Sequence, residues 1–219
     1  CEPASLLGYN VLITTSNAHG ISELQSLVES NRVDGMLLTR ALEDDRALQY
    51  LSQVNFPTAL TGTCRYDNII QVDTDNEGAA EKMTTLLIGK GFRRFAFLVK
   101  DMSYNVDRKR HEGFCRALIK NGISEKDQLF YNGSIRMEFL DAIIENIISK
   151  KVECIICGDD EICTMVMSRL QAEGYRIPKD VAIASLYNST NLDCYSPAVT
   201  AVSVAASQMG GTAVRRRCV

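Results

Sequence analysis

The chain has 219 residues, 46% of them hydrophobic, which is enough to bury a substantial core as one large domain or two small ones. Its net charge of −3 and isoelectric point near 5.5 lack the basic excess that phosphate contacts require, so a DNA-binding role for this chain alone is disfavoured. No apolar run approaches the roughly 18 residues of a membrane span, and no signal-peptide pattern opens the chain. We therefore expect a soluble, cytoplasmic protein.

Eight cysteines raise the question of disulfides or metal binding. Most of them lie inside apolar periodic segments, which favours reduced thiols over a disulfide framework. The one CxxC pair, Cys154 and Cys157, lies in the apolar run 152–157, where a strand would send the two side chains to opposite faces. We interpret the pair as structural and not as a redox or metal site. Because the chain has only two histidines, His19 and His111, we expect no metal site and no cofactor.

Short apolar runs alternate with segments of helical periodicity in the first third of the chain. This pattern predicts strands and helices, in chain order, at 10–15, 21–30, 33–39, 44–54 and 56–62. The sequence TDNE at 74–77 then matches a capping box, in which Thr74 caps the next helix and Glu77 returns a hydrogen bond. That helix is expected to end near Gly89.

The same rhythm continues through the second part of the chain. It predicts alternating strands and helices at 94–100, 105–121, 128–132, 137–149, 153–158, 160–173 and 180–187. Such alternation is typical of a parallel sheet covered on both faces. The predicted fold class is α/β, with two doubly wound parallel-sheet lobes comprising residues 1–74 plus 204–219 and residues 75–203. Because the opening CEPASLLG resembles the end of a helix, we expect the first lobe to lack its first strand.

On a helix of 3.6 residues per turn, the basic residues of the run DRKRHEGF at 107–114 fall on different faces. Arg110 extends by one turn the apolar stripe that is formed by Gly113, Phe114, Ala117 and Leu118. Arg108 and Lys109 fall outside that stripe, and we expect them in solvent. An inward guanidinium at this end of a helix needs a partner, either a buried carboxylate or a bound ligand. The residues alone leave both alternatives open.

Polar residues follow most of the predicted strands. The carboxyl ends of parallel strands gather at one edge of a sheet, which is where α/β folds bind ligands. We therefore predict a ligand site, and we expect Arg40 and Lys100 to add positive charge to it. Adjacent acids such as Asp159 and Asp160 could hold a metal or act in acid-base chemistry, but at a helix start they more often cap the helix or bind a ligand. The residues assigned to the ligand site are Arg110, Asp159, Tyr187, Thr61, Thr15 and Arg40.

Motifs of the common enzyme classes are absent from the sequence. No GxGxxG follows a predicted strand, no P-loop lysine motif occurs, and no serine lies in a nucleophile elbow. Dinucleotide, nucleoside-triphosphate and hydrolase chemistry therefore lack the backbone geometry that they need. We predict that the chain is not an enzyme.

Several blocks of the sequence, taken in their order and spacing, resemble the effector-binding and dimerisation domain of the LacI/GalR transcriptional regulators. They cover nearly the whole chain and include GYNVLITTSN (8–17), VDGMLLT (33–39), RHEGFCRALIKNGI (110–123) and YSPAVTAV (195–202). The resemblance implies a fold similar to periplasmic sugar-binding proteins, with a small sugar or sugar acid bound between two lobes. It also implies a homodimer, and operator binding through an amino-terminal helix-turn-helix headpiece that this sequence lacks.

The resemblance also bears on individual residues. Arg110 matches the arginine of the family's R-x-x-G-F block, which hydrogen-bonds the effector, and Asp159 stands where the family usually has asparagine. Where many sugar-binding members have an aspartate in a G-Y-D block, this chain has Ser185, Leu186 and Tyr187. That replacement removes an acceptor for sugar hydroxyls and a charge that would repel a carboxylate, so it favours a sugar acid. Asp159 favours a neutral sugar.

Two other functions are compatible with the same fold. A transport-type solute-binding protein is disfavoured by the unpaired cysteines and the absent signal peptide. An α/β enzyme using Asp159 and Asp160 is disfavoured by the missing catalytic motifs. A helix-turn-helix upstream of Cys1 would support a regulator, and a secretory signal would support a transport protein.

The net charge predicts that these 219 residues do not bind operator DNA by themselves. With 24 basic and 27 acidic side chains, the chain has no excess of cations to neutralise phosphates. In a mobility-shift assay at physiological salt we expect no sequence-specific complex. A shift that is specific for one DNA sequence would show that the DNA-binding function lies within this chain.

Overall fold

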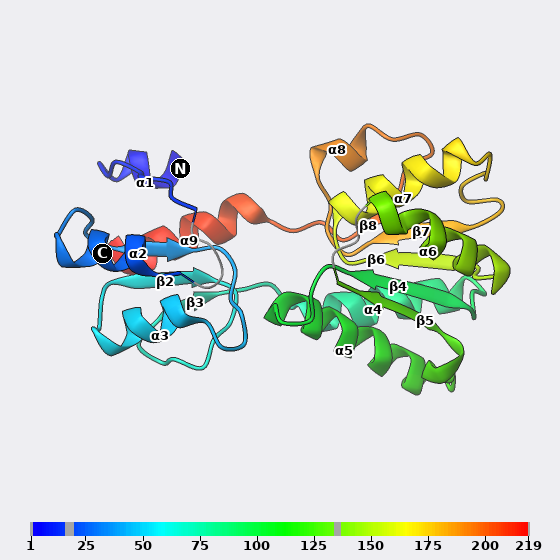
Figure 1. Cartoon of the computed structure of the whole chain (residues 1–219), viewed down its shortest axis with the longest axis horizontal. Coiled ribbons are helices and arrows are strands. Elements are labelled where there is room, and N and C mark those ends of the chain that lie inside the picture. The colour runs from blue at the N-terminus through cyan, green and yellow to red at the C-terminus, as the bar shows by residue number, and fades with distance from the viewer. Residues whose placement is uncertain (1, 16–19, 134–136, 219) are drawn as a thin grey trace. The chain divides into compact units, whose positions relative to one another are not determined.

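A computed structural model of the chain describes residues 2–15, 20–133 and 137–218. The chain divides into two compact units, and each is described by itself. Unit 1 comprises Cys1–Thr74 and Ala205–Val219, and unit 2 comprises Asp75–Val204. Both are α/β units built on a parallel sheet, as the alternating sequence pattern predicts (Figure 1).

Unit 1 is built on a sheet of three parallel strands in the order β1-β2-β3. Asp45 begins α3, since its carboxylate accepts hydrogen bonds from the backbone N–H groups of Ala47 and Leu48 at 2.9 and 3.0 Å. Leu48 and Leu51 are fully buried. The elements of unit 1 are α1 (Glu2–Leu6), α2 (Ser22–Glu29), β1 (Met36–Leu38), α3 (Arg46–Gln53), β2 (Thr58–Thr61), β3 (Ile70–Val72) and α9 (Ala206–Cys218).

The strand predicted at residues 10–15 is wrong, because this segment has no regular structure. Its apolar side chains are open to solvent, with Leu12 60% and Ile13 76% exposed. A strand is stable only when a neighbour satisfies its backbone donors and acceptors. In the described sheet of unit 1, β1 pairs only with β2, and β3 takes the other edge of β2. The sequence pattern did not predict β3, which has only three residues.

Unit 2 contains a five-stranded parallel sheet in the order β5-β4-β6-β7-β8. The strands and helices predicted from 94 onward are confirmed, and the two-residue β8 adds a strand that the pattern did not predict. The elements are α4 (Asn76–Gly89), β4 (Phe95–Val99), α5 (Asn105–Lys120), the 3-10 helix η1 (Glu125–Asp127), β5 (Leu129–Asn132), α6 (Met137–Ser149), β6 (Cys154–Cys157), α7 (Asp160–Ala172), β7 (Ala182–Ser185), α8 (Thr190–Asp193) and β8 (Thr200–Ala201). None of the described helices is both long and apolar enough to cross a bilayer.

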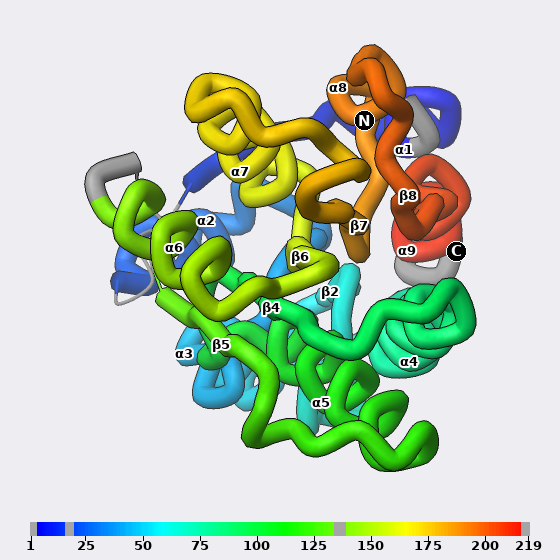
Figure 2. The backbone as a smooth tube through the Cα atoms, turned by 90° about the vertical axis from the view of Figure 1, so that its right-hand side faces the viewer, coloured from blue at the N-terminus to red at the C-terminus, as the bar shows by residue number. Residues whose placement is uncertain are grey.

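The sheet of unit 2 is buried on both faces. Helices α4 and α5 cover one face, and α6 and α7 cover the other (Figure 2). Alternate residues of each strand enter different cores, because successive side chains point to opposite faces. Cys154 packs in the core beneath α4 and α5, whereas Cys157 packs in the core beneath α6 and α7. This confirms that the CxxC pair is divided between the two faces.

The start of α4 differs from the predicted capping box. The N-cap is Asp75, whose carboxylate accepts a hydrogen bond from the Gly78 N–H at 2.8 Å, and not Thr74. Shifting the cap by one residue places Gly78, instead of Glu77, at the position of the returning acid. Glu77 is then turned toward α5, where it forms an ion pair with Arg116.

Helices α4 and α5 approach each other closely at Gly113. A Cβ atom at this position would overlap the backbone carbonyl oxygen of Glu77 and lie 3.0 Å from the Cβ of Ala80. The glycine therefore allows α5 to lie against the backbone of α4. Phe114 follows it into the core and stacks on Phe97 with ring centroids 4.8 Å apart.

Replacing Gly113 with alanine is expected to destabilise unit 2. The added methyl group meets backbone, which cannot move aside as a flexible side chain can, so the two helices must separate. Overpacking of this kind costs about 1–3 kcal/mol, which chemical denaturation would measure as a lower free energy of unfolding.

Gly89→Ala is the matched control, because Gly89 also lies in a helix but a Cβ there meets nothing within 4 Å. Alanine is the better helix former, so this variant is expected to be unchanged or stabilised by up to about 1 kcal/mol. Equal stabilities for the two variants would contradict the close helix contact.

Candidate functional site

The unit 2 sheet has a topological switch point between β4 and β6. The chain passes from β4 to β5 on one side and then crosses to β6 on the other side of β4. Connections that leave neighbouring strands in opposite directions open a crevice at the carboxyl ends of those strands. Lys100 follows β4 at this edge, and Gly158 and Asp159 follow β6. This edge is the candidate site of unit 2.

Arg110 lies on α5 with only 8% of its surface exposed, so the inward orientation predicted from the helix stripe is confirmed. Its Nη1 donates a 2.7 Å hydrogen bond to the carbonyl oxygen of Gly158. One partner of this guanidinium is therefore the backbone where β6 ends, a kind of partner that the sequence did not suggest. The hydrogen bond fixes the guanidinium beside the switch point.

Gly158 is itself held tightly at the end of β6. Its N–H donates to the carbonyl oxygen of Leu98 at 2.7 Å, which continues the pairing of β6 with β4. A Cβ at this position would lie 2.9 Å from Val99 Cγ1 and 3.1 Å from the Leu98 carbonyl oxygen, so a larger residue would force β4 or its side chains to shift. The carbonyl that receives Arg110 is thus positioned by the sheet.

Asp107 is a buried acid at the same end of α5 that the sequence analysis missed. It is 8% exposed, and its carboxylate accepts a hydrogen bond from the Asp101 N–H at 3.1 Å. Asp107 therefore ties the loop after β4 to the first turn of α5. Its position three residues before Arg110, on the same face of the helix, was the signal that could have identified it.

Asp159 caps α7, because its carboxylate accepts a hydrogen bond from the Ile162 N–H at 2.9 Å. A cap of this kind contributes about 0.5–2 kcal/mol to helix stability. The capping interpretation of this acid is therefore confirmed. Its other carboxylate oxygen lies 2.9 Å from Lys100 Nζ.

Lys100 does not add an uncompensated positive charge to the site, contrary to expectation. It forms ion pairs with both Asp159 and Glu161. Burial opposes the charged ammonium, but hydrogen bonds to Glu161 and Asp159 hold the pKa of Lys100 above its ordinary value. The pair of acids neutralises this cation because both stand at the start of α7, next to the end of β4.

Arg108 and Lys109 are half-buried, so the prediction that they lie in solvent is wrong. Arg108 Nη2 donates a 2.6 Å hydrogen bond to the side chain of Asn105. Long basic side chains commonly lay their methylene groups along a helix surface and keep only the charged end polar. The apolar stripe of a helix predicts which side chains face the core. It does not predict how exposed the residues beside the stripe are, here Arg108 and Lys109.

Tyr187 lies two residues beyond β7 and is half-buried. Its backbone is fixed by Ser185, whose buried hydroxyl donates to the Tyr187 carbonyl oxygen at 2.7 Å. The carboxyl end of β7 is in this way closed by a local turn. Because β7 is the neighbour of β6, Tyr187 lies at the same sheet edge as Asp159.

The predicted site residues of unit 1 have more varied positions. Thr61 ends β2, and its hydroxyl donates to the Leu38 carbonyl oxygen at the end of β1 at 3.3 Å. Arg40 is exposed two residues beyond β1, so these two share one sheet edge. Thr15 belongs to the irregular segment 10–15 and is carried by no strand.

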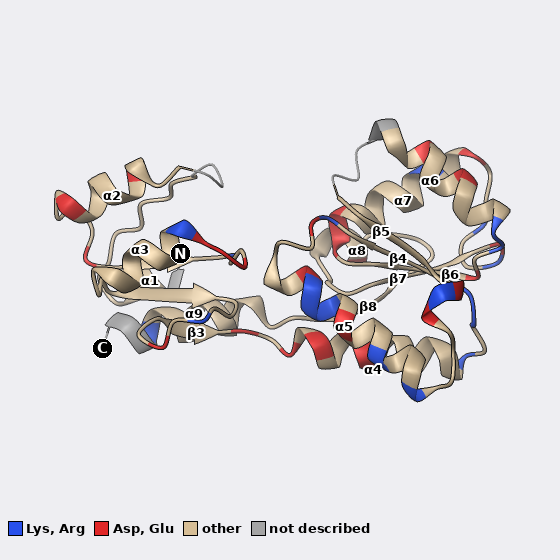
Figure 3. Cartoon of the chain, turned by 60° about the horizontal axis from the view of Figure 1, so that its bottom comes forward, with Lys and Arg blue, Asp and Glu red and all other residues tan. Residues whose placement is uncertain are grey.

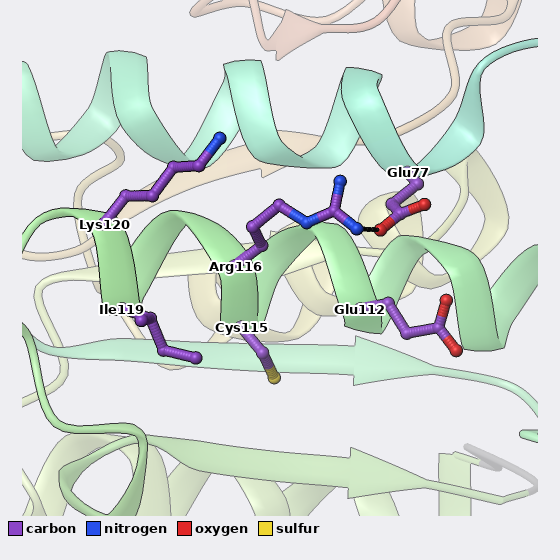
Figure 4. A pocket seen from close by; sticks show the side chains of 6 residues that line it. All are labelled: Glu77, Glu112, Cys115, Arg116, Ile119 and Lys120. Carbon is purple, nitrogen blue, oxygen red and sulfur yellow. Dashed lines mark ion pairs between the residues drawn. The ribbon is translucent and has the colours of Figure 1, made fainter.

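The outer face of α4 and α5 carries charges of both signs (Figure 3). Glu77, Glu112, Cys115, Arg116, Ile119 and Lys120 line a shallow hollow of about 580 Å³ there, which Figure 4 shows from close by. Arg116 pairs with Glu77, and Lys120 pairs with Glu81 at 2.5 Å. Exposed pairs of this kind contribute little to stability.

Comparison with known proteins places this fold in a family. Residues 84–217 match the family model described as periplasmic binding protein-like domain. The chain is 24% identical over 215 residues to catabolite control protein A from Staphylococcus xylosus, covering 97% of this chain and 65% of that protein. It spans 62% to 66% of the length of such curated relatives.

Two solved structures resemble the chain over 99% of its length. One is a putative transcriptional regulator LacI from Bacillus cereus subsp. cytotoxis NVH 391-98, with a TM-score of 0.89, 29% identity and 79% of that chain covered. The other is the transcriptional regulator CelR in complex with cellobiose, with a TM-score of 0.86, 25% identity and 68% of that chain covered. The resemblance inferred from the sequence blocks is thereby confirmed.

Proposed function

This chain belongs to the periplasmic binding protein-like domain family of the LacI-type regulators, and from that premise we propose that it senses a small sugar or sugar acid for a transcriptional regulator. The observation that carries the proposal is the buried guanidinium of Arg110, held on the Gly158 carbonyl beside the switch point of the sheet. The CelR relative in its cellobiose complex supports a sugar as the ligand class.

Arg110 is the proposed anchor of the effector. A guanidinium already fixed by the fold loses little further freedom when it binds, and its planar donors suit a carboxylate or a pair of hydroxyl groups. Asp159 and Tyr187 are the proposed neighbouring contacts at the same sheet edge. The proposal keeps Arg40 and Thr61 of unit 1 as effector contacts because they share one sheet edge, and Thr15 stays a prediction from the sequence.

Because Lys100 is paired with two acids, it provides no uncompensated positive charge to attract an anionic effector. Without an uncompensated lysine, the case for a carboxylate on the effector rests on Arg110 and on Tyr187 in place of the family's aspartate. One carboxylate oxygen of Asp159 caps α7, and the other forms an ion pair with Lys100. It is therefore a weaker acceptor for sugar hydroxyls than an unengaged carboxylate would be, and a sugar acid stays the favoured class.

The proposed regulator works by a shift between two conformations. An effector changes the output only through its different affinities for the two states. We assign operator recognition to a helix-turn-helix segment outside these 219 residues, since their net charge of −3 supplies no phosphate-binding excess. No enzymatic step is part of this proposal.

We further propose that the protein is a homodimer. Large apolar side chains are exposed near the start of unit 1, among them Leu6 at 81% and Ile13 at 76%. Exposed apolar surface of this kind favours a protein partner. Sedimentation at micromolar concentration, with the flanking segments of the natural protein present, is expected to show a dimer. A monomer alone would contradict this assembly.

The role of Arg110 can be tested once a ligand is found by a thermal-shift screen of sugars, aldonates and phosphosugars, with cellobiose included. Losing a charge-assisted contact costs about 1.5–3 kcal/mol, so Arg110→Ala is expected to weaken effector binding by more than about tenfold in calorimetry.

Arg108→Ala is the matched control, because Arg108 lies on the same helix and hydrogen-bonds to Asn105. Its affinity for the effector is expected to equal that of the wild type. Far-ultraviolet circular dichroism of both variants separates loss of binding from loss of folding. If folded Arg110→Ala binds as tightly as the wild type, Arg110 has only a structural role.

A further inference from the structure

Three side chains with metal-binding donors meet beside α5 of unit 2, two from this helix and one from η1. His111 and Cys115 are four residues apart and thus neighbours on one helix face, and Glu125 begins η1 after the chain has turned back. The Cys115 sulfur lies 3.5 Å from His111 Nε2 and 3.2 Å from Glu125 Oε1. One ligand atom from each residue lies within 4.8 Å of the other two.

The two separations from the Cys115 sulfur agree with edges of a tetrahedral zinc site. With Zn–S of about 2.3 Å and Zn–N and Zn–O of about 2.0–2.2 Å, the ligand atoms of a tetrahedron lie about 3.4–3.6 Å apart. The two distances from the sulfur are within about 0.4 Å of those values. The His111 and Glu125 ligand atoms lie within 4.8 Å of each other, so side-chain movement would have to bring these two to the same spacing. The donor set of thiolate, imidazole and carboxylate is one that Zn²⁺ commonly binds.

We propose that His111, Cys115 and Glu125 form a Zn²⁺ site on the surface of unit 2. Three protein ligands leave the fourth tetrahedral position for a water molecule. When the ion binds, the thiol of Cys115 gives up its proton to solvent and the sulfur coordinates as thiolate. This site departs from the sequence-based expectation of no metal, which weighed the number of histidines and not their spacing from cysteine.

The surrounding structure orients the imidazole. The His111 ring packs against Phe130 of β5 with centroids 4.2 Å apart, and it meets Phe97 of β4 edge-on at 5.8 Å. Aromatic packing on this side limits rotation of the ring and keeps it next to the sulfur. A ligand that is already positioned loses less conformational entropy when it binds the metal.

An ion can reach the site from solvent. His111 and Cys115 are half-buried, and Glu125 is exposed. Cys115 also borders the shallow hollow of α4 and α5, and Figure 4 shows its side chain directed away from α4 and from the Arg116–Glu77 pair. The bound metal would link α5 to η1, which leads directly into β5, and would stabilise the folded unit by mass action.

A simpler alternative is a hydrogen bond from the Cys115 thiol to Glu125 without any metal. Cobalt distinguishes the two, because Co²⁺ bound to a thiolate gives a sulfur-to-metal charge-transfer absorption that a hydrogen bond cannot produce. We expect the 219-residue chain, kept reduced, to bind one Co²⁺ with this absorption and to lose it on addition of one equivalent of Zn²⁺.

The variants report on individual ligands. Cys115→Ser is expected to abolish the absorption, and His111→Gln and Glu125→Gln to weaken Co²⁺ binding by at least about tenfold, since even indirect support of a metal ligand is worth 10- to 100-fold. Glu125 is exposed, so its variant tests the site without disturbing a core. Cys194→Ser is the matched control, because Cys194 is an exposed free cysteine outside the cluster.

The site is disproved if the wild-type chain shows no charge-transfer absorption. It is equally disproved if folded Cys115→Ser retains the absorption, if Cys194→Ser loses it, or if Glu125→Gln binds Co²⁺ as tightly as the wild type. None of these outcomes depends on the effector, so the zinc site and the sensing function are tested separately.

Discussion

The hydrogen bond from Arg110 to the Gly158 carbonyl is the interaction on which the candidate site of unit 2 depends. It joins α5 to the point where β6 ends and α7 is about to begin. A buried guanidinium is costly unless its donors are satisfied, so the backbone that receives it must be held in place. The sheet does this through the Gly158 N–H bond to Leu98, and the lack of a side chain at Gly158 allows the close approach. A residue suited to ligand recognition is thus also part of the framework.

The charged residues at the carboxyl edge of the unit 2 sheet already have partners within the protein. Asp107 and Asp159 both accept hydrogen bonds from the backbone. Asp107 accepts from the Asp101 N–H, and Asp159 caps α7 by accepting from the Ile162 N–H. Lys100 is then paired with Asp159 and Glu161, so its positive charge is offset by acids of the protein itself. The first backbone N–H groups of a helix have no intrahelical partner, and these carboxylates satisfy such donors. The recognition chemistry proposed here therefore relies on Arg110.

Helix α5 has three faces with different roles. Phe114, Leu118 and Gly113 pack toward the sheet and α4, while Arg110 continues that buried stripe to the carboxyl edge. Arg116 and Lys120 face the acids of α4. His111 and Cys115 face β5 and η1. The His111 ring packs against Phe130 of β5, and the Cys115 sulfur contacts Glu125 of η1. Because 3.6 residues complete a turn, one helix of 16 residues can support a core, an ion-pair surface and the proposed metal site without conflict.

The α/β class, four of the five parallel strands of unit 2, the division of Cys154 and Cys157 between two faces, and the inward orientation of Arg110 could all be predicted from the sequence alone. All of these follow from periodicities of 2 and 3.6, which act over a few neighbouring residues. Four features were visible only once the chain was folded: 10–15 is not a strand, Asp75 and not Thr74 caps α4, Lys100 is neutralised, and Glu125 approaches Cys115. Each of those outcomes depends on groups far apart in the chain or on which of several local donors finds a partner. A local pattern does not contain that information, since strand pairing and charge pairing are settled only when separate segments meet.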